Sequence, residues 1–279
     1  MTVEIVEVAP AKLNLALHVR ARRDDGYHEL DTLFVFVRDG DDLRIVPADA
    51  DRFTITGPFA SALDPAADNL VTRARDLFRR EIAPAPPVAI ELIKRLPVAS
   101  GIGGGSADAA ATLRALARLT GIAPDDARLD AVAGRLGSDV PACLLGRAAR
   151  GSGRGEQLIE IAGLPGRPVL LVNPGVAVST ARVFAGWDGV DRGGIGEGPL
   201  IDIAQAGRND LQPAACAIAP VIADVLGHLS ALPGAAMARM SGSGATCFAL
   251  FDDRAACAAA ATMTRDRHPD WWCLETVLT

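Results

Sequence analysis

The sequence predicts an α+β fold. Segments with the alternating apolar pattern of strands and segments with the apolar spacing of helices are mixed along the chain, without a regular strand–helix–strand repeat. The length of 279 residues suffices for two domains, and 49% hydrophobic with 22% charged residues is typical of a globular protein. A glycine-rich segment directly before a helical pattern predicts a loop that approaches a ligand closely.

The first half of the chain is predicted to contain several strands and three helices. Apolar residues at the odd positions from 13 to 19 alternate with polar or small residues at the even positions. This alternation predicts a half-buried strand over 12–20, with Lys12 and Asn14 side by side on its polar face. A helix over 70–82 is expected to begin at a cap formed by Asp68. Further strands are expected over 30–37, 43–46, 53–56 and 88–93, and further helices around 110–117 and 129–136.

The second half begins after a turn-rich segment, 151–155 through 163–167, which we interpret as the passage between two domains over 1–162 and 163–279. A helical region over 211–232 is interrupted by Pro213 and Pro220. The remaining predictions are a buried strand over 169–172, a helix over 179–187, a glycine-rich loop over 188–199, a strand–loop–strand over 236–251, an alanine-rich helix over 252–267 and a terminal strand over 271–278.

Charge and cysteine content exclude several classes of protein. The net charge of -6, with scattered Lys and Arg, argues against a general nucleic-acid surface. The longest apolar stretch, 214–223, contains a proline and is too short to cross a bilayer, and the N-terminus shows no secretory pattern. Five widely spaced cysteines without Cys-x-x-Cys favour reduced, mostly buried thiols. We therefore expect a cytoplasmic protein with a small-molecule partner, no nucleic acid and no membrane; the oligomeric state stays open.

The segment Gly101–Ala109 is the most informative feature. Four glycines in five positions follow a strand-like run and precede a helical pattern, so several backbone N–H groups and the positive end of a helix can point at one anion. A flexible surface linker is the weaker interpretation, because a linker is not expected to lead directly into a helix as this segment does. The Walker-type loop is excluded because Gly105 is followed by Ser106-Ala107, and the dinucleotide fingerprint fails at Ser106.

Three separated segments resemble the GHMP kinases, a superfamily of small-molecule kinases. They are Ala9-Pro10-Ala11-Lys12-Leu13-Asn14-Leu15, the run from Leu96 to Ala110, and Met240-Ser241-Gly242-Ser243-Gly244-Ala245-Thr246. The resemblance implies a two-domain GHMP kinase fold: an N-terminal α+β domain that carries the phosphate loop, and a C-terminal ferredoxin-like α+β domain. It also implies ATP and Mg²⁺ as cofactors.

Within this superfamily, the chain resembles the branch that phosphorylates the 2-hydroxyl of 4-diphosphocytidyl-2-C-methyl-D-erythritol in isoprenoid biosynthesis. The matching segments are 23–30, 94–97, 136–141, 178–180 and 209–211. The chain departs from that pattern in three places. Ala99-Ser100 replace further glycines, and Ala142-Cys143 replace a bulkier aromatic pair. We interpret a glycine-rich stretch near 193–198 as an insertion.

The resemblance assigns Asp139 as the base that accepts the proton of the attacking hydroxyl, and Lys12 as its partner. Asp139 or Ser138 could also serve as the cap of a helix whose first turn holds Pro141. A lone lysine on a strand is usually solvated, so the role of Lys12 depends on the matched motif. Asn14 on the same face would help to hold the substrate, or be an ordinary polar strand residue.

The resemblance also assigns binding residues. Tyr27, the only tyrosine, would stack on cytosine and His28 would bind the edge of the base, although such a pair in a loop is more often structural. Lys94 would bind a substrate phosphate. A solvated lysine at the end of a strand is an almost equally good interpretation of this residue. The segment Ser241, Gly242, Ser243, Gly244 would close the substrate pocket or form a tight turn. The ATP phosphates would lie against Pro97, Val98, Ala99, Ser100, Gly101, Ile102, Gly103, Gly104, Gly105, Ser106 and Ala107, with Ser106 also near Mg²⁺.

Two other functions stay open from the sequence. A different acceptor, such as mevalonate, homoserine or a sugar, is disfavoured by Tyr27-His28 and by Lys94-Arg95-Leu96-Pro97. A nucleotide-sensing module without turnover is disfavoured because both Lys12 and Asp139 are present.

Overall fold

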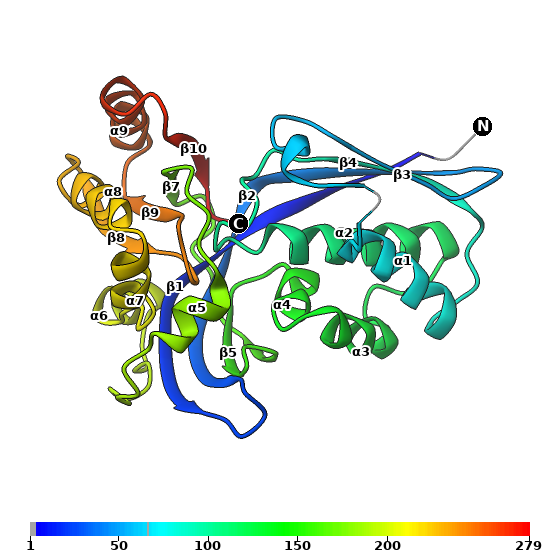
Figure 1. Cartoon of the computed structure of the whole chain (residues 1–279), viewed down its shortest axis with the longest axis horizontal. Coiled ribbons are helices and arrows are strands. Elements are labelled where there is room, and N and C mark those ends of the chain that lie inside the picture. The colour runs from blue at the N-terminus through cyan, green and yellow to red at the C-terminus, as the bar shows by residue number, and fades with distance from the viewer. Residues whose placement is uncertain (1–3, 66) are drawn as a thin grey trace. The chain divides into compact units, whose positions relative to one another are not determined.

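The structure is a computed structural model that describes residues 4–65 and 67–279 and has the predicted α+β fold (Figure 1). The chain forms two compact units, and each unit is discontinuous in sequence. The first contains the chain up to Ala11 together with Asp39–Val98 and Gly103–Gly146, and the second contains Lys12–Arg38, Ala99–Ile102 and Arg147–Thr279. A single boundary between 162 and 163 does not describe these units, so the division into sequence domains stays a prediction.

The first unit packs helices on one face of a small sheet. Strands β1 (Ile5–Arg22) and β2 (His28–Pro47) each contribute residues to both units. In this unit, the end of β2 pairs antiparallel with β4 (Val88–Ile93), which pairs parallel with β3 (Arg52–Thr56). The helices below these strands in Figure 1 are α1 (Leu70–Glu81), α2 (Gly104–Thr120), α3 (Ala127–Leu136) and α4 (Val140–Leu145), and a short 3₁₀ turn covers Ala60–Ala62.

The second unit contains the ferredoxin-like element that the family resemblance implies. Its four-stranded antiparallel sheet has the order β10-β7-β9-β8, formed by β7 (Pro168–Asn173), β8 (Ala235–Met240), β9 (Cys247–Phe251) and β10 (Trp272–Val277). Helices α8 (Val221–Ser230) and α9 (Arg254–Arg267) place Ile222, Val225 and Ala260 in one core with Leu170 and Phe251. This order and the two helices correspond to the βαββαβ pattern.

The second unit contains five further elements besides this sheet and its two helices. β5 (Ala149–Gly153) pairs antiparallel with β2 and with β6 (Gln157–Glu160). Three short helices follow β7: α5 (Thr180–Ala185), α6 (Leu200–Ala206) and α7 (Gln212–Ile218).

Several predictions about local structure are wrong in detail. The strand over 12–20 is part of β1, but it is not half-buried, because Lys12, Asn14 and His18 on its polar face are at most 3% exposed. Helix α1 is capped by Asn69 instead of Asp68, since the Asn69 side chain accepts a hydrogen bond from the backbone N–H of Val71. Helix α6 lies between the predicted loop over 188–199 and the predicted helical region over 211–232, where no helix was expected.

Glycines permit close packing at two places in these strands. The two strands predicted over 30–37 and 43–46 form the single strand β2, which passes so close to β1 that a Cβ at Gly40 would lie 2.0 Å from the carbonyl oxygen of Ala9. The turn-rich segment at 151–155 is the β5–β6 hairpin, in which a Cβ at Gly151 would lie 2.6 Å from the Phe34 ring. Glycine in these strands therefore indicates a close approach of neighbouring groups and does not interrupt the strand.

Candidate active site

The glycine-rich segment has the strand–loop–helix setting that the sequence predicts. It follows β4 and leads into α2, whose N-cap Gly103 has a left-handed conformation with φ 68°. The first N–H groups of a helix have no partner within the helix, and together with its dipole they favour an anion. Ala99 is a non-glycine residue with positive φ (52°), so the chain keeps a left-handed bend where other family members were expected to have glycine.

Hydrogen bonds within the second unit join the three motifs. The backbone N–H of Lys12 donates to the carbonyl of Ile102 at 2.9 Å, and the backbone N–H of Thr246 donates to the carbonyl of Ser100 at 3.0 Å. The Ser241 hydroxyl completes the junction, since its Oγ donates to the carbonyl of Gly101 at 3.0 Å and accepts from the backbone N–H of Asn14 at 3.2 Å. Segments distant in sequence therefore form one structure.

The two glycine loops fit together only because neither carries a side chain at the contact. A Cβ on Gly101, which has φ +77°, would lie 2.5 Å from the carbonyl oxygen of Ser241. A Cβ on Gly242, which has φ +53°, would lie 2.7 Å from the carbonyl oxygen of Gly101. The hairpin around Ser241–Gly244 therefore packs on the first loop.

Asn209 holds the second glycine loop, a role that the sequence did not predict. Its Nδ2 donates to the carbonyls of Met240 and Gly242, both at 2.8 Å, and its Oδ1 accepts from the backbone N–H of Leu211 at 3.0 Å. The signal was the Asn209-Asp210-Leu211 segment itself, which resembled the family but also had the pattern of an ordinary helix start.

Lys12 and Asn14 belong to a chain of buried polar contacts. Lys12 Nζ donates to Asn14 Oδ1 at 2.9 Å, and Asn14 Nδ2 donates to Thr32 Oγ1 at 2.7 Å. The Thr32 hydroxyl in turn donates to the carbonyl of Ala16 at 2.7 Å. The Lys12 ammonium also lies 5.2 Å from the centre of the Phe34 ring. Lys12 is therefore held in one orientation by its neighbours on β1 and β2.

Asp139 is the N-cap residue of α4, with Pro141 in the first turn, as the sequence predicts. Its half-buried side chain makes no capping hydrogen bond. The Asp139 carboxylate is therefore not used as a capping group of this helix. Because Lys12 and Asp139 belong to different compact units, their pairing stays a prediction.

Tyr27 and His28 are consecutive residues of the second unit with different surroundings. Tyr27 is 51% exposed and has the Arg154 guanidinium 4.7 Å from its ring centre. The His28 ring is 5.0 Å from Phe184 and 5.8 Å from Trp187, and its Nε2 is buried without a hydrogen-bond partner among the described residues. Burial, together with the charge of Arg22, lowers the pKa of His28, so the ring is neutral at pH 7. Phe184 and Trp187 were not identified from the sequence.

One of the two interpretations from the sequence, that Lys94 is a solvated lysine, is wrong. It is 2% exposed, and its Nζ donates to Asp41 at 2.5 Å and to Asp108 at 2.8 Å. Burial favours the neutral amine, but the two carboxylates outweigh it and raise the pKa of Lys94. Asp41 also accepts from the backbone N–H groups of Arg95 and Leu96, so this cluster anchors the chain directly before the glycine-rich loop. Binding of a substrate phosphate by Lys94 stays a prediction.

The described part of the chain has neither a metal cluster of its own nor a membrane span. Within 4–65 and 67–279, no three His, Cys, Asp or Glu side chains are grouped as a metal site would require. The same residues form no helix with the length and apolar character needed to span a membrane. Cys216, Cys247, Cys257 and Cys273 are buried or half-buried thiols, as predicted.

Comparison with known proteins agrees with this site. The family described as GHMP kinases N terminal domain matches residues 69–147, and the family described as GHMP kinases C terminal matches residues 198–267. Together with the three joined motifs, these matches define a GHMP kinase, an enzyme that takes its phosphoryl group from ATP.

Two relatives, both named 4-diphosphocytidyl-2-C-methyl-D-erythritol kinase, match almost end to end. The relative from Rhizorhabdus wittichii is 54% identical over 98% of this chain and 94% of its own length, and the one from Sphingopyxis alaskensis is 50% identical over 100% of both. The chain belongs to the family of 4-diphosphocytidyl-2-C-methyl-D-erythritol kinases.

Solved structures lead to the same family. A crystal structure of 4-(cytidine 5'-diphospho)-2C-methyl-D-erythritol kinase superimposes with a TM-score of 0.81 at 35% identity, over 98% of this chain and 99% of that one. A homoserine kinase from Cytophaga hutchinsonii has a TM-score of 0.74 at 18% identity, over 99% of this chain and 94% of that one, and shows the shared fold alone.

Proposed function

We propose that this chain transfers the γ-phosphoryl group of ATP to the 2-hydroxyl of 4-diphosphocytidyl-2-C-methyl-D-erythritol, in the methylerythritol phosphate route to isoprenoids. The observation that carries the proposal is the junction of three motifs in one unit, with the exposed Tyr27 ring next to His28 and its aromatic neighbours after β1. The relatives at 54% and 50% identity support the choice of acceptor.

The chemistry requires positioning and charge more than covalent catalysis, because phosphoryl transfer has a loose transition state. In our proposal, Asp139 accepts the proton of the acceptor hydroxyl as that oxygen attacks the γ-phosphorus in line. The Lys12 ammonium, oriented by Asn14 and buried beside Phe34, compensates the negative charge of the transferring group. No covalent enzyme intermediate forms.

We further propose that residues 97–107 bind the phosphates of ATP through backbone N–H groups, and that Ser241–Gly244 closes the acceptor side. When bound together with ATP, Mg²⁺ would supply positive charge that neutralises the phosphates. Since Mg²⁺ usually keeps several waters and takes few protein ligands, the Ser106 hydroxyl in the first turn of α2 suits such a site. The site of action is the cytoplasm in this proposal, which the buried thiols support.

The cytosine would bind between Tyr27 and the residues beside His28. The exposed ring of Tyr27 offers a stacking surface, and the neutral His28 can exchange a hydrogen bond with the edge of the base. Phe184, at 5.0 Å from His28, is a second aromatic surface for the same base.

One experiment tests the proposed function. ADP release is measured with ATP and each candidate acceptor in turn, namely the cytidyl polyol, mevalonate, homoserine and a sugar, with and without Mg²⁺. We expect turnover with the cytidyl acceptor and Mg²⁺ only. Turnover with another acceptor would replace this function by that one, and ATP binding without any turnover would favour a nucleotide-sensing module.

Replacing Tyr27 by Ala is expected to raise KM for the cytidyl acceptor by about 5- to 150-fold, because base–aromatic stacking contributes about 1–3 kcal/mol. KM for ATP and thermal stability should change little, since Tyr27 is 51% exposed. Steady-state kinetics with each substrate varied in turn measures the effect. The matched control is Tyr27→Phe, which keeps the ring and should keep KM. An unchanged KM in Tyr27→Ala would exclude stacking on this ring.

A further inference from the structure

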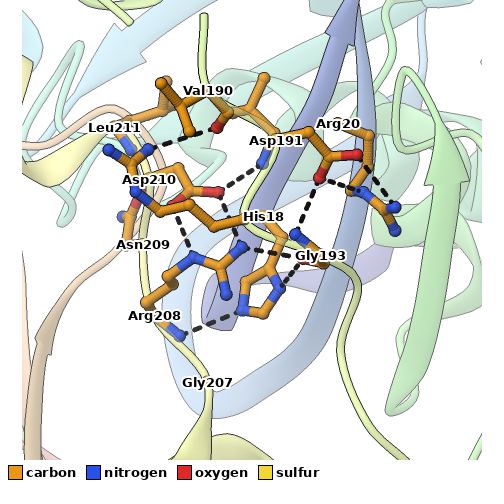
Figure 2. Close-up of polar contacts among 12 residues, drawn as sticks. His18, Arg20, Val190, Asp191, Gly193, Gly207, Arg208, Asn209, Asp210 and Leu211 are labelled. Atoms are coloured by element: carbon orange, nitrogen blue, oxygen red, sulfur yellow. Dashed lines mark hydrogen bonds and ion pairs between the residues drawn. The ribbon is translucent and has the colours of Figure 1, made fainter. Parts of the chain in front are cut away.

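The glycine-rich segment Asp188–Gly198, here called the strap, is held on β1 by a polar cluster (Figure 2). His18 Nδ1 lies 3.0 Å from the carbonyl oxygen of Gly193, and Arg208 Nη2 donates to the same oxygen at 2.8 Å. Arg208 is itself fixed by Asp210, whose Oδ1 accepts from Arg208 Nε at 2.7 Å. A single carbonyl of the strap therefore receives two hydrogen bonds from the body of the second unit.

The contacts of His18 define its protonation state. The backbone N–H of Arg208 donates to Nε2 at 3.2 Å, so Nε2 is unprotonated and Nδ1 carries the hydrogen that binds Gly193. Burial, and then the charge of Arg208, lowers the pKa of His18, in agreement with a neutral ring. His18 is 2% exposed, so it belongs to the buried interior of the fold, and the proposed mechanism assigns it no role.

Two more anchors hold the strap on either side of Gly193. Arg20 binds both carboxylate oxygens of Asp191, at 2.8 and 3.1 Å. Asp31 Oδ2 accepts from the backbone N–H of Ile195 at 2.7 Å, while Arg150 bridges Asp31 and the carbonyl of Ile195. The approach is close, because a Cβ on Gly194 would lie 2.8 Å from Asp31 Oδ2 and 2.6 Å from Arg20 Nη1.

The strap continues directly from the segment that contacts His28. Helix α5 carries Phe184, and Trp187 immediately precedes the strap. Arg22 donates to the carbonyl of Trp187 at 2.7 Å, so β1 also holds the residue that directly precedes the strap. His18, Arg20 and Arg22 occupy alternate positions of β1, in phase with Lys12 and Asn14. One strand thus positions the phosphoryl-transfer residues and the segment beside the base site.

We propose that the strap is a specificity element for the base end of the acceptor, with His18, Asp31 and Arg208 as positioning residues. By fixing the strap, they keep Phe184 and Trp187 against His28 and so set the affinity for a pyrimidine nucleotide portion of the substrate. This inference rests on the proposed function.

A pair of glycine substitutions within the strap tests the proposal. Gly194→Val places a side chain against Asp31 and Arg20, whereas the matched control Gly196→Val meets open space, since nothing lies within 4 Å of a Cβ there. A misplacement of about 1 Å can cost up to about 10²-fold. We expect Gly194→Val to raise KM for the cytidyl acceptor about tenfold, with kcat, KM for ATP and Tm unchanged, and Gly196→Val to behave as wild type. His18→Leu, which removes both ring hydrogen bonds, should raise the same KM.

The outcomes separate this inference from the function on which it rests. Wild-type turnover of the cytidyl acceptor with an unchanged KM in Gly194→Val and His18→Leu would overturn the strap proposal alone. A parallel rise in KM for ATP, or a fall in Tm of Gly194→Val, would show a general structural role and also overturn it. A wild-type enzyme that turns over a different acceptor would overturn the proposed function and the strap proposal together.

Discussion

Replacing Asp139 by Asn is expected to lower kcat by about 10²- to 10⁴-fold, the usual contribution of a positioned general base. An amide cannot accept the proton of the acceptor hydroxyl, although it has almost the same size and shape. The affinity for ATP should change little, because the phosphates are proposed to lie on residues 97–107. Folding should also be preserved, since Asp139 makes no capping hydrogen bond to α4 and Asn is itself a good N-cap residue.

A matched control separates catalysis from helix capping. Asp126 is the N-cap of the neighbouring helix α3, and its side chain accepts from the backbone N–H of Arg128. Asp126→Asn should leave kcat unchanged, so single-turnover rates and ATP titrations of the two variants can be compared directly. Full activity in Asp139→Asn would remove Asp139 from the mechanism.

Replacing Lys94 by Met is expected to lower the free energy of unfolding by about 3–5 kcal/mol, the usual cost of removing one partner from a buried ion pair. The change leaves the carboxylates of Asp41 and Asp108 buried, at 0% and 4% side-chain exposure, without a cation. Because Asp41 binds the backbone directly before the phosphate loop, KM for ATP should rise as well. Urea unfolding at pH 8 measures the stability.

The pH dependence has a defined sign. Burial raises the pKa of the Asp108 carboxyl to about 7, and the variant lacks the Lys94 ammonium that opposes this rise. Because the same carboxyl has a pKa of about 3.9 in the unfolded chain, the native state binds more protons than the unfolded state. The stability of Lys94→Met should therefore increase from pH 8 to pH 6, towards that of wild type. The control is Arg44→Met, which breaks the exposed pair with Glu91 at 3.8 Å and should cost less than about 1 kcal/mol. A loss in Lys94→Met no larger than in Arg44→Met would contradict the buried cluster.

Most helices and strands could be predicted because each has a local signal. The alternation over 12–20 indicated the strand, and the apolar spacing over 70–82 indicated the helix. Alternation reports only which face is more polar, so it could not show that the polar face of β1 is covered as well. Likewise, the glycines at 151–155 favour a turn, and the neighbouring Phe34 ring explains why Gly151 lies within strand β5 while the turn begins only after Gly153.

The site was predictable where a contiguous motif carries it. The phosphate loop, the glycine hairpin and the cap position of Asp139 follow from local sequence and family resemblance. Partnerships between distant residues did not follow. Asp41 and Asp108 have the appearance of ordinary surface acids until the fold brings both to Lys94, and Asn209 resembles a helix cap until it contacts Met240 and Gly242. Such contacts depend on tertiary packing, which a single sequence does not encode locally.

A crystal structure with a non-hydrolysable ATP analogue and the cytidyl acceptor would test the central claim most directly. We predict the triphosphate along residues 97–107, the acceptor 2-hydroxyl within hydrogen-bond distance of the Asp139 carboxylate and in line with the γ-phosphorus, and cytosine on Tyr27. A triphosphate bound away from residues 97–107, or an acceptor hydroxyl remote from Asp139, would contradict it.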